Sequence, residues 1–120
     1  LQVLILSDTF YQFATPLMRK LGWPTLFCNF LDVDAQGRVA DYRLRQKDGK
    51  REAVRALHGL HFRVIAAGDS YNDTSMLGEA DAGILFRPPD NVIREFPQLP
   101  VAGCYDAVRT EIEAALARIG

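Results

Sequence analysis

Residues 64–73 have the sequence VIAAGDSYND, an apolar run that ends abruptly in a glycine and two carboxylates. The run predicts a buried strand at about residues 63–67 that presents Asp69 and Asp73 beyond its carboxyl end. In open α/β sheets, ligands bind in the crevice at that end of the strands. Two oxygen donors at this spacing suit Mg²⁺, which usually takes one or two protein carboxylates together with phosphate and water oxygens. The alternative is an ordinary turn in which Asn72 or Asp73 caps the following helix.

Predicted strands and helices alternate on both sides of this stretch. Upstream, the sequence predicts a strand at 1–6, a helix at 10–21, a β-hairpin at 25–45 and a helix at 50–60. Downstream, it predicts a helix at 74–79, a strand at 82–86, a helix at 88–96, an edge strand at 99–103 and a helix at 106–119. Such alternation implies parallel βαβ units with right-handed crossovers. We therefore expect an α/β fold with a Rossmann-like parallel sheet and a β-hairpin insertion.

The strand at 1–6 is almost continuously apolar, which is the pattern of a central strand covered on both faces. It leads into Ser7, Asp8 and Thr9, whose side chains are suited to cap the helix at 10–21. A hydroxyl and free N–H groups at the positive end of a helix dipole form a site for a phosphate-sized anion. The alternative is an N-cap without a ligand. The predicted buried face of the helix consists of Phe10, Phe13, Leu17 and Leu21.

Two lysines, Lys47 and Lys50, lie at the entry to the helix at 50–60. A cation in the first turn of a helix is mildly unfavourable for the helix dipole, so its position there calls for compensation. A phosphoryl group would supply that compensation, and a solvated lysine in a polar loop is the alternative. We expect Lys50 to be the functional lysine because the helix would hold it rigidly, although Lys47 is close enough to leave the assignment open.

The composition limits the kinds of partner. The 120 residues are 48% hydrophobic and 24% charged, as in ordinary globular domains, and a net charge of -1 gives no sequence-wide attraction to nucleic acid or anionic lipid. No apolar run reaches the roughly 18–20 residues that a membrane span needs. Cys28 and Cys104 fit neither a metal-ligand spacing nor a disulfide framework, so we expect both to be buried, reduced thiols. The lack of a membrane span or a basic leader predicts a cytoplasmic location. We expect a small-molecule partner, and the sequence does not decide between a monomer and a homodimer.

A strand-end hydroxyl, a lysine and a carboxylate pair follow one another on consecutive βα units. This set suits phosphoryl transfer, which depends mainly on positioning and on neutralising charge around phosphorus. The segments ILSDT, KDGKREAV and AAGDSYNDTSML also resemble the second, third and fourth motifs of the haloacid dehalogenase superfamily, in particular its phosphoserine phosphatase branch. Further similarity in PLMRKLG, YRLRQKD, AGILF and NVIREFPQ extends the resemblance over nearly the whole chain.

The resemblance implies a Mg²⁺-dependent phosphatase or phosphotransferase that acts on phosphoserine through a phospho-aspartyl intermediate. It leaves open whether the phosphoryl group passes to water or to homoserine. Carried over residue by residue, it divides the candidate residues into two groups. Substrate binding is assigned to Ser7, Asp8, Thr9, Lys50 and Asn72, with Ser7 holding the phosphate and Asn72 facing it. Catalysis is assigned to Lys50, Asp69 and Asp73, with Asp69 binding Mg²⁺ and Asp73 bracing the metal shell or Lys50.

The chain departs from the family in its first motif, an upstream aspartate pair of which one residue attacks phosphorus and the other acts as acid and base. No Asp-x-Asp follows an apolar strand near Leu1, and Asp32 and Asp34, which have the spacing, fall in the predicted hairpin. The cap segment between the first two motifs is absent as well. We expect residues 1–120 to be the C-terminal part of a haloacid dehalogenase-like core domain that lacks the first-motif strand, with residues 25–45 as a flap. Alone, it should be inactive.

Two other functional classes are compatible with the same polar residues. A non-catalytic βα domain would use them to bind a phosphorylated ligand or a partner chain. A receiver-like signalling domain would also carry clustered acids and a lysine, but its phospho-acceptor cannot be placed in this sequence. Magnesium-dependent hydrolysis separates the enzyme from both.

Overall fold

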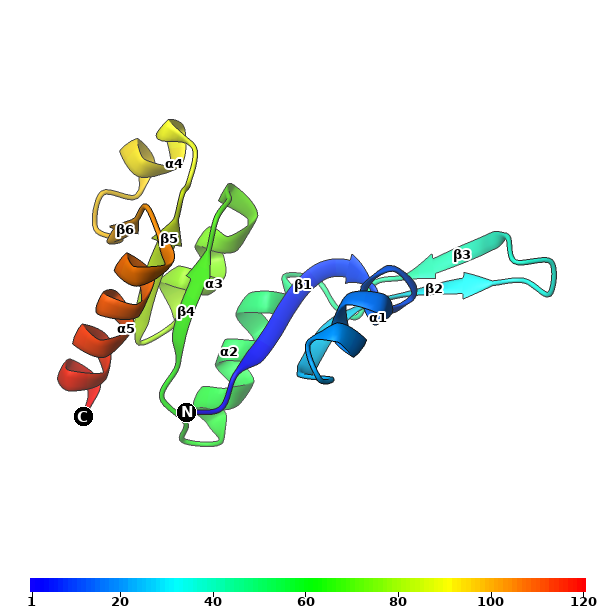
Figure 1. The fold of residues 1–120 in the computed structure, drawn as a ribbon, viewed down its shortest axis with the longest axis horizontal. Coiled ribbons are helices and arrows are strands. Elements are labelled where there is room, and N and C mark those ends of the chain that lie inside the picture. The colour runs from blue at the N-terminus through cyan, green and yellow to red at the C-terminus, as the bar shows by residue number, and fades with distance from the viewer. The chain divides into compact units, whose positions relative to one another are not determined.

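The computed structural model describes all of residues 1–120. The chain forms two compact units, Leu1–Gly49 and Lys50–Gly120, and each contains a three-stranded sheet (Figure 1). Both sheets contain parallel strand pairs, which confirms the α/β class. The assignment of all 120 residues to one core domain stays a prediction. None of the helices combines the length and the apolar character that crossing a membrane requires.

The first unit is built from one βα element and a hairpin. Its elements are β1 (Leu4–Phe10), α1 (Tyr11–Lys20), β2 (Thr25–Val33) and β3 (Val39–Arg43). The central strand is β2, which pairs in parallel with β1 through its first half and antiparallel with β3 through its second half. The hairpin is therefore confirmed where residues 30–33 pair with residues 39–43, and every residue of β3 is exposed. The prediction that the flap begins at residue 25 is wrong, because the first half of β2 pairs with β1 as the central strand of the sheet. Figure 1 shows the far half of the hairpin extending beyond β1 and α1 as a two-stranded ribbon.

The turns of this unit depend on glycines in the left-handed conformation. Gly22 follows α1 with a φ of 79°, and Gly37 lies in the β2–β3 turn with a φ of 78°. The Asp34 side chain closes the same turn by accepting hydrogen bonds from the N–H groups of Gln36 and Arg38, each at 2.9 Å. Glycine adopts positive φ without steric cost and Asp bonds to nearby backbone, so both turns follow from local sequence.

The strand β1 differs from the predicted central, doubly covered strand. It is an edge strand of its sheet, and its apolar residues are only half-buried. It also continues through Ser7, Asp8 and Thr9, so the prediction that these residues cap α1 is wrong; the N-cap is Phe10, without a side-chain cap hydrogen bond. The cause is local, because the Ser7 hydroxyl accepts a hydrogen bond from the Thr9 N–H at 3.2 Å. The β1–β2 pairing is irregular at this point, as in a β-bulge.

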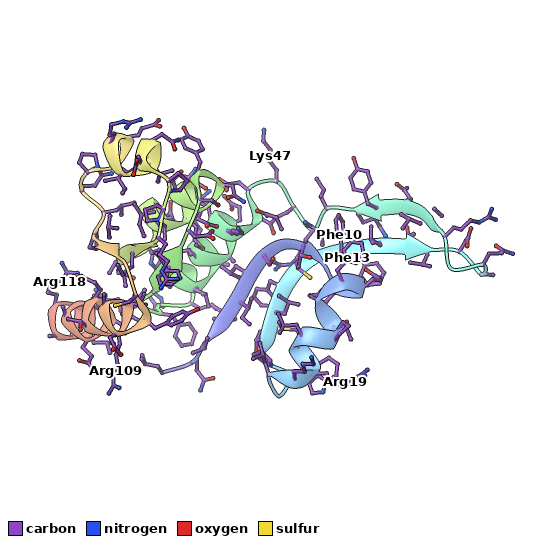
Figure 2. All side chains as sticks on the ribbon, turned by 45° about the horizontal axis from the view of Figure 1, so that its top comes forward. Phe10, Phe13, Arg19, Lys47, Arg109 and Arg118 are labelled. Carbon is purple, nitrogen blue, oxygen red and sulfur yellow. The ribbon has the colours of Figure 1, made fainter.

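The buried face of α1 also differs from the prediction. Ala14 and Met18 are buried, whereas Phe13 and Leu17 are 68% and 55% exposed. Leu21 is exposed as well, and the Phe13 and Phe10 rings form a T-shaped pair with their centroids 6.1 Å apart (Figure 2). The two sets of residues form neighbouring stripes one position apart, and both stripes are apolar. Periodicity alone therefore could not decide which stripe faces the sheet.

The second unit is a parallel sheet with helices between its strands. It contains α2 (Gly49–Gly59, which begins one residue before the unit), β4 (Ile65–Gly68), a 3₁₀ turn (Tyr71–Asp73), α3 (Thr74–Glu79), β5 (Ala82–Phe86), α4 (Asp90–Glu95), β6 (Val101–Ala102) and α5 (Tyr105–Ile119). The strand order is β4-β5-β6, with β4 paired from Ile65↔Ala82 to Gly68↔Leu85. In Figure 1, α3 lies beside β4 and β5, and α5 runs alongside β5 and β6.

The hydrophobic core of the second unit is centred on β5, which is buried over most of its length. Its least exposed large side chains come from four different elements, namely Val54, Leu77, Ile84, Leu85 and Val92. Gly83 lets β5 approach α3, since a Cβ there would lie 2.6 Å from the Leu77 carbonyl oxygen. The predicted elements are confirmed to within a few residues. Leu60 and Leu116, which the helical periodicity places on the apolar faces of the helices predicted at 50–60 and 106–119, are exposed. Pro89, expected in the first turn of the helix at 88–96, is the N-cap of α4, and Cys104, expected to be buried, is exposed.

Candidate functional site

The loop after β4 carries the acidic residues that the sequence singled out. The strand ends at Gly68, and Asp69 is the first residue beyond it. The Asp69 carboxylate is exposed and makes no hydrogen bond or ion pair within the chain, while its N–H donates to Asp73 Oδ2 at 3.0 Å. An exposed carboxylate at the carboxyl edge of a parallel sheet can still accept a ligand.

The Asp73 carboxylate, in contrast, is buried and fully engaged. Its Oδ1 atom accepts a hydrogen bond from Lys50 Nζ at 2.6 Å. Its Oδ2 atom accepts hydrogen bonds from the N–H groups of Asp69 and Ser70, at 3.0 and 3.2 Å, and contacts the Ser70 hydroxyl at 3.3 Å. Asp73 therefore holds both the loop and the Lys50 ammonium in place, while its role in catalysis stays a prediction.

The glycine before Asp69 is required by this arrangement. A Cβ placed on Gly68 would lie 2.5 Å from the Asp73 Cβ atom and 2.7 Å from its Cγ and Oδ2 atoms. Such distances are clashes, so only glycine lets the Asp73 carboxylate fold back under the end of β4. The spacing of Gly68, Asp69 and Asp73 in the sequence thus has a direct steric explanation.

Lys50 lies in the first turn of α2, as predicted, and its side chain is only 13% exposed. Lys47 is exposed, projects away from the ribbon in Figure 2 and makes no ion pair. The lysine held against the acidic loop is therefore Lys50. A buried ion pair is rigid because releasing either partner leaves an uncompensated charge, at a cost of about 3–5 kcal/mol.

The electrostatics of Asp73 follow from the same contacts. Burial alone would raise its pKa, but the hydrogen bond and charge of Lys50 and the N–H groups of Asp69 and Ser70 outweigh that effect. The pKa of Asp73 consequently lies below its ordinary value, and the carboxylate is ionised at neutral pH.

Two residues of the loop were not singled out from the sequence. Ser70 forms a reciprocal capping box with Asp73 and also hydrogen-bonds Asn72 Oδ1. The pattern of a serine followed three residues later by an acidic residue could have identified this cap. Tyr71 packs edge-on against Phe96, and its hydroxyl donates to Glu95 at 3.3 Å, so the loop is also tied to α4. No local pattern would have revealed that contact.

The remaining predicted residues lie in the first unit. Ser7 is half-buried and bonded to the Thr9 N–H, whereas Asp8 is exposed and its carbonyl accepts a hydrogen bond from Asn29 Nδ2 at 3.1 Å. The second unit thus brings together Lys50, Asp69, Ser70, Asn72 and Asp73. The first unit contains Ser7, Asp8 and Thr9.

The donor set can be tested for a metal ion. No group of three or more His, Cys, Asp or Glu side chains is arranged to hold one. A zinc-type centre therefore has no ligands here. Mg²⁺ needs only one or two protein carboxylates, with the other positions filled by phosphate and water. The free carboxylate of Asp69 fits that requirement, and the engaged carboxylate of Asp73 does not.

Sequence comparison identifies the family. The model of the haloacid dehalogenase-like hydrolase family matches residues 1–81. The chain belongs to this family. It is 64% identical over 110 residues to a phosphoserine phosphatase of Pseudomonas syringae pv. tomato, covering 92% of this chain and 46% of the relative. It is 60% identical over 117 residues to the phosphoserine phosphatase ThrH of Pseudomonas aeruginosa, covering 98% and 57%. The chain thus spans about half the length of these relatives.

Solved structures support the same fold. A probable phosphoserine phosphatase from Vibrio cholerae superposes with a TM-score of 0.74 at 19% identity, over 97% of this chain and 38% of that one. A phosphoserine phosphatase in the apo form superposes with a TM-score of 0.66 at 24% identity, over 82% and 51%. At such identities the likeness concerns the fold alone, and it confirms the predicted haloacid dehalogenase-like architecture.

Proposed function

We propose that these residues form part of a Mg²⁺-dependent phosphatase or phosphotransferase that acts on phosphoserine or a closely related phosphorylated amino acid. The observation that carries the proposal is the buried Lys50–Asp73 pair next to the free carboxylate of Asp69. Membership of a hydrolase family and the names of two relatives at 60–64% identity support the substrate class.

In this proposal, each residue of the loop has a distinct task. Asp69 would hold Mg²⁺, which when bound supplies positive charge to the phosphoryl oxygens. Lys50 would bring a second positive charge to the phosphoryl group, and Asp73 would keep that ammonium in place. Asn72 would donate an amide N–H to the phosphate. Preorganised charge of this kind stabilises the transition state because no reorganisation is needed during the reaction.

Ser7 would hold the phosphate from the β1 segment, with Thr9 and Asp8 beside it. These three residues lie in the irregular part of β1, and bulged segments commonly adjoin active sites. This assignment rests on the family resemblance of ILSDT and is independent of the loop after β4.

The attacking aspartate of the proposed mechanism would come from outside these 120 residues. Its carboxylate oxygen would bond to phosphorus as the bond to the serine oxygen breaks, and the leaving serine oxygen would take a proton from the partner acid. Water would then hydrolyse the phospho-aspartyl ester, or homoserine would accept the phosphoryl group. The proposed setting is serine metabolism in the cytoplasm, where the free thiols of Cys28 and Cys104 would stay reduced.

The experiment joins this chain to the part of the Pseudomonas aeruginosa relative that it does not cover. The chimera should release phosphate from phosphoserine with Mg²⁺ and lose that activity in EDTA. Asp69→Asn should remove turnover while far-UV circular dichroism stays unchanged, and Asp90→Asn, at the start of α4, is the matched control. Undiminished turnover in Asp69→Asn would refute the assigned role. Adding homoserine and measuring phosphohomoserine then decides between hydrolysis and transfer.

A further inference from the structure

A hollow of about 370 Å³ lies in the first unit, between the start of α1 and the base of the hairpin. Pockets for small molecules have volumes of roughly 300–1,000 Å³, so this one suits a compact ligand. One lining residue comes from α1, two come from β2, and the others come from the end of β3 and the residues after it. These residues are Tyr11, Cys28, Phe30, Arg43, Leu44 and Arg45.

The two arginines of the hollow differ in how their charges are balanced. Arg43 forms an ion pair with Asp32 at 2.6 Å, so its charge is neutralised within the hairpin. Arg45 has no acidic partner. Its guanidinium lies 4.4 Å from the centroid of the Phe27 ring. The backbone N–H of Arg45 donates to Asn29 Oδ1 at 2.9 Å. Arg45 is therefore held in place by an aromatic ring and its own backbone while its charge stays unpaired.

The walls of the hollow offer almost no other polar group. The Tyr11 hydroxyl already donates to the Leu26 carbonyl at 2.9 Å, so Tyr11 presents its ring, tilted against that of Phe30 with the centroids 6.1 Å apart. Cys28 is 3% exposed. Burial raises the pKa of its thiol, and this effect outweighs the positive charge of Arg45, which lowers it. The hollow thus combines apolar walls with one uncompensated cation.

We propose that this hollow binds a small organic monocarboxylate with an apolar body. The planar fork of Arg45 matches the two oxygens of a carboxylate, and the rings of Tyr11 and Phe30 match an apolar body. One unpaired cation balances one negative charge, whereas a phosphate dianion would bring more charge and more acceptors than the hollow can satisfy. The site uses no residue of the proposed phosphoryl-transfer mechanism.

The first test uses phenylacetate as the probe, titrated into the full chain by isothermal titration calorimetry. Phenylacetamide has the same shape without the charge, and inorganic phosphate has charge without the apolar body. Phenylacetate should bind at least about tenfold more tightly than phenylacetamide, because a hydrogen bond to a charged group is lost in the amide. Phosphate should not displace it. Equal binding of the amide, or displacement by phosphate, would overturn the proposal.

Variants locate the binding at Arg45. Arg45→Gln should weaken phenylacetate binding by about tenfold or more, because it removes the charged fork. Arg19→Gln is the matched control, since Arg19 is also an exposed arginine over an aromatic ring, Trp23, at 6.0 Å and has no ion pair (Figure 2). Equal affinities in the two variants would overturn the proposal.

A chemical measurement tests the same site without altering Arg45. In a Cys104→Ser chain, Cys28 is the only thiol. Bound carboxylate should slow its alkylation by iodoacetamide several-fold, because the ligand blocks access and its charge offsets that of Arg45 beside the thiol. Phenylacetamide should give little protection. An alkylation rate that saturating phenylacetate leaves unchanged would show that the ligand binds elsewhere.

Discussion

The two units of the chain differ in how completely they bury their side chains. All five of the large side chains with the lowest exposure lie in Lys50–Gly120. Of the 18 exposed large hydrophobic residues, 11 lie in Leu1–Gly49, which has only 49 of the 120 residues. The acidic loop therefore belongs to a unit with fully buried large side chains. The Ser7–Thr9 segment belongs to a unit in which many large hydrophobic side chains are exposed.

The two polar segments show the same difference in their hydrogen bonds. In the acidic loop, one buried carboxylate receives contacts from Lys50, Asp69 and Ser70. In β1, the Ser7 hydroxyl accepts one local hydrogen bond, from Thr9. Burial explains the contrast, because a carboxylate removed from water is stable only when its oxygens are satisfied. The acidic loop is thus preorganised by its own unit.

The largest expected effect comes from breaking the buried ion pair. Lys50→Ala should lower the free energy of unfolding of the second unit by about 3–5 kcal/mol, because the Asp73 carboxylate would stay buried without its cation. Arg51→Ala is the control: Arg51 pairs with Glu79 at 3.0 Å, but its side chain is 45% exposed. That change should cost about 0–1 kcal/mol. Both losses in the free energy of unfolding can be measured by urea unfolding, with hydrogen exchange of the α2 and α3 amides as the probe. Equal losses would mean that Lys50 is not held as described.

A steric change tests the packing of the loop. Gly68→Ala should destabilise the second unit by about 1–3 kcal/mol, since the new methyl group would overlap the Asp73 side chain. Gly78→Ala, in α3, has open space around its Cβ and should instead stabilise by about 0.5–1 kcal/mol. Thermal unfolding of the two variants should therefore shift in opposite directions. A tolerated alanine at Gly68 would contradict the close approach of Asp73.

The sequence allowed the second unit to be predicted better than the first. Around Asp69, the apolar run, the glycine and the acids all indicated one structure, and the α2, β5 and α3 segments were placed within a residue or two. In the first unit, α1 has two neighbouring apolar stripes, and the Ser7 hydroxyl accepts a hydrogen bond from the Thr9 N–H within β1 instead of capping a helix. Tertiary packing decides the first choice and a local hydrogen bond the second, and neither is encoded in residue spacing. The functional roles of all the candidate residues stay predictions, namely those of Ser7, Asp8, Thr9, Lys50, Asp69, Asn72 and Asp73.

A smaller effect is expected from pH. The pKa values of Asp73 and Asp81 are both lowered: Lys50 and backbone N–H groups outweigh burial at Asp73, and the Val64 N–H and His58 act on Asp81. A carboxylate whose pKa is lower in the folded state than in the unfolded state, where it is about 3.9, stabilises the fold at pH values above about 3.9. That stabilisation is lost as the pH falls through the folded-state pKa. Hydrogen exchange of the second unit should therefore show falling stability below about pH 4. Asp81→Asn should make that fall less steep, and an unchanged pH profile would count against the Val64 and His58 contacts.

The smallest expected effect tests the exposed face of α1. Leu17 is 55% exposed, so Leu17→Gln removes little buried surface and should change the free energy of unfolding by no more than about 0.5 kcal/mol. Met18, one position on, is 6% exposed, and Met18→Gln places an unpaired amide among apolar side chains. That substitution should cost about 2–5 kcal/mol, since it combines lost burial with an unsatisfied polar group. The fluorescence of Trp23, which follows α1, reports the unfolding of this unit. If Leu17→Gln proved as costly as Met18→Gln, the Leu17 stripe would be buried in solution and the originally predicted helix face would be right.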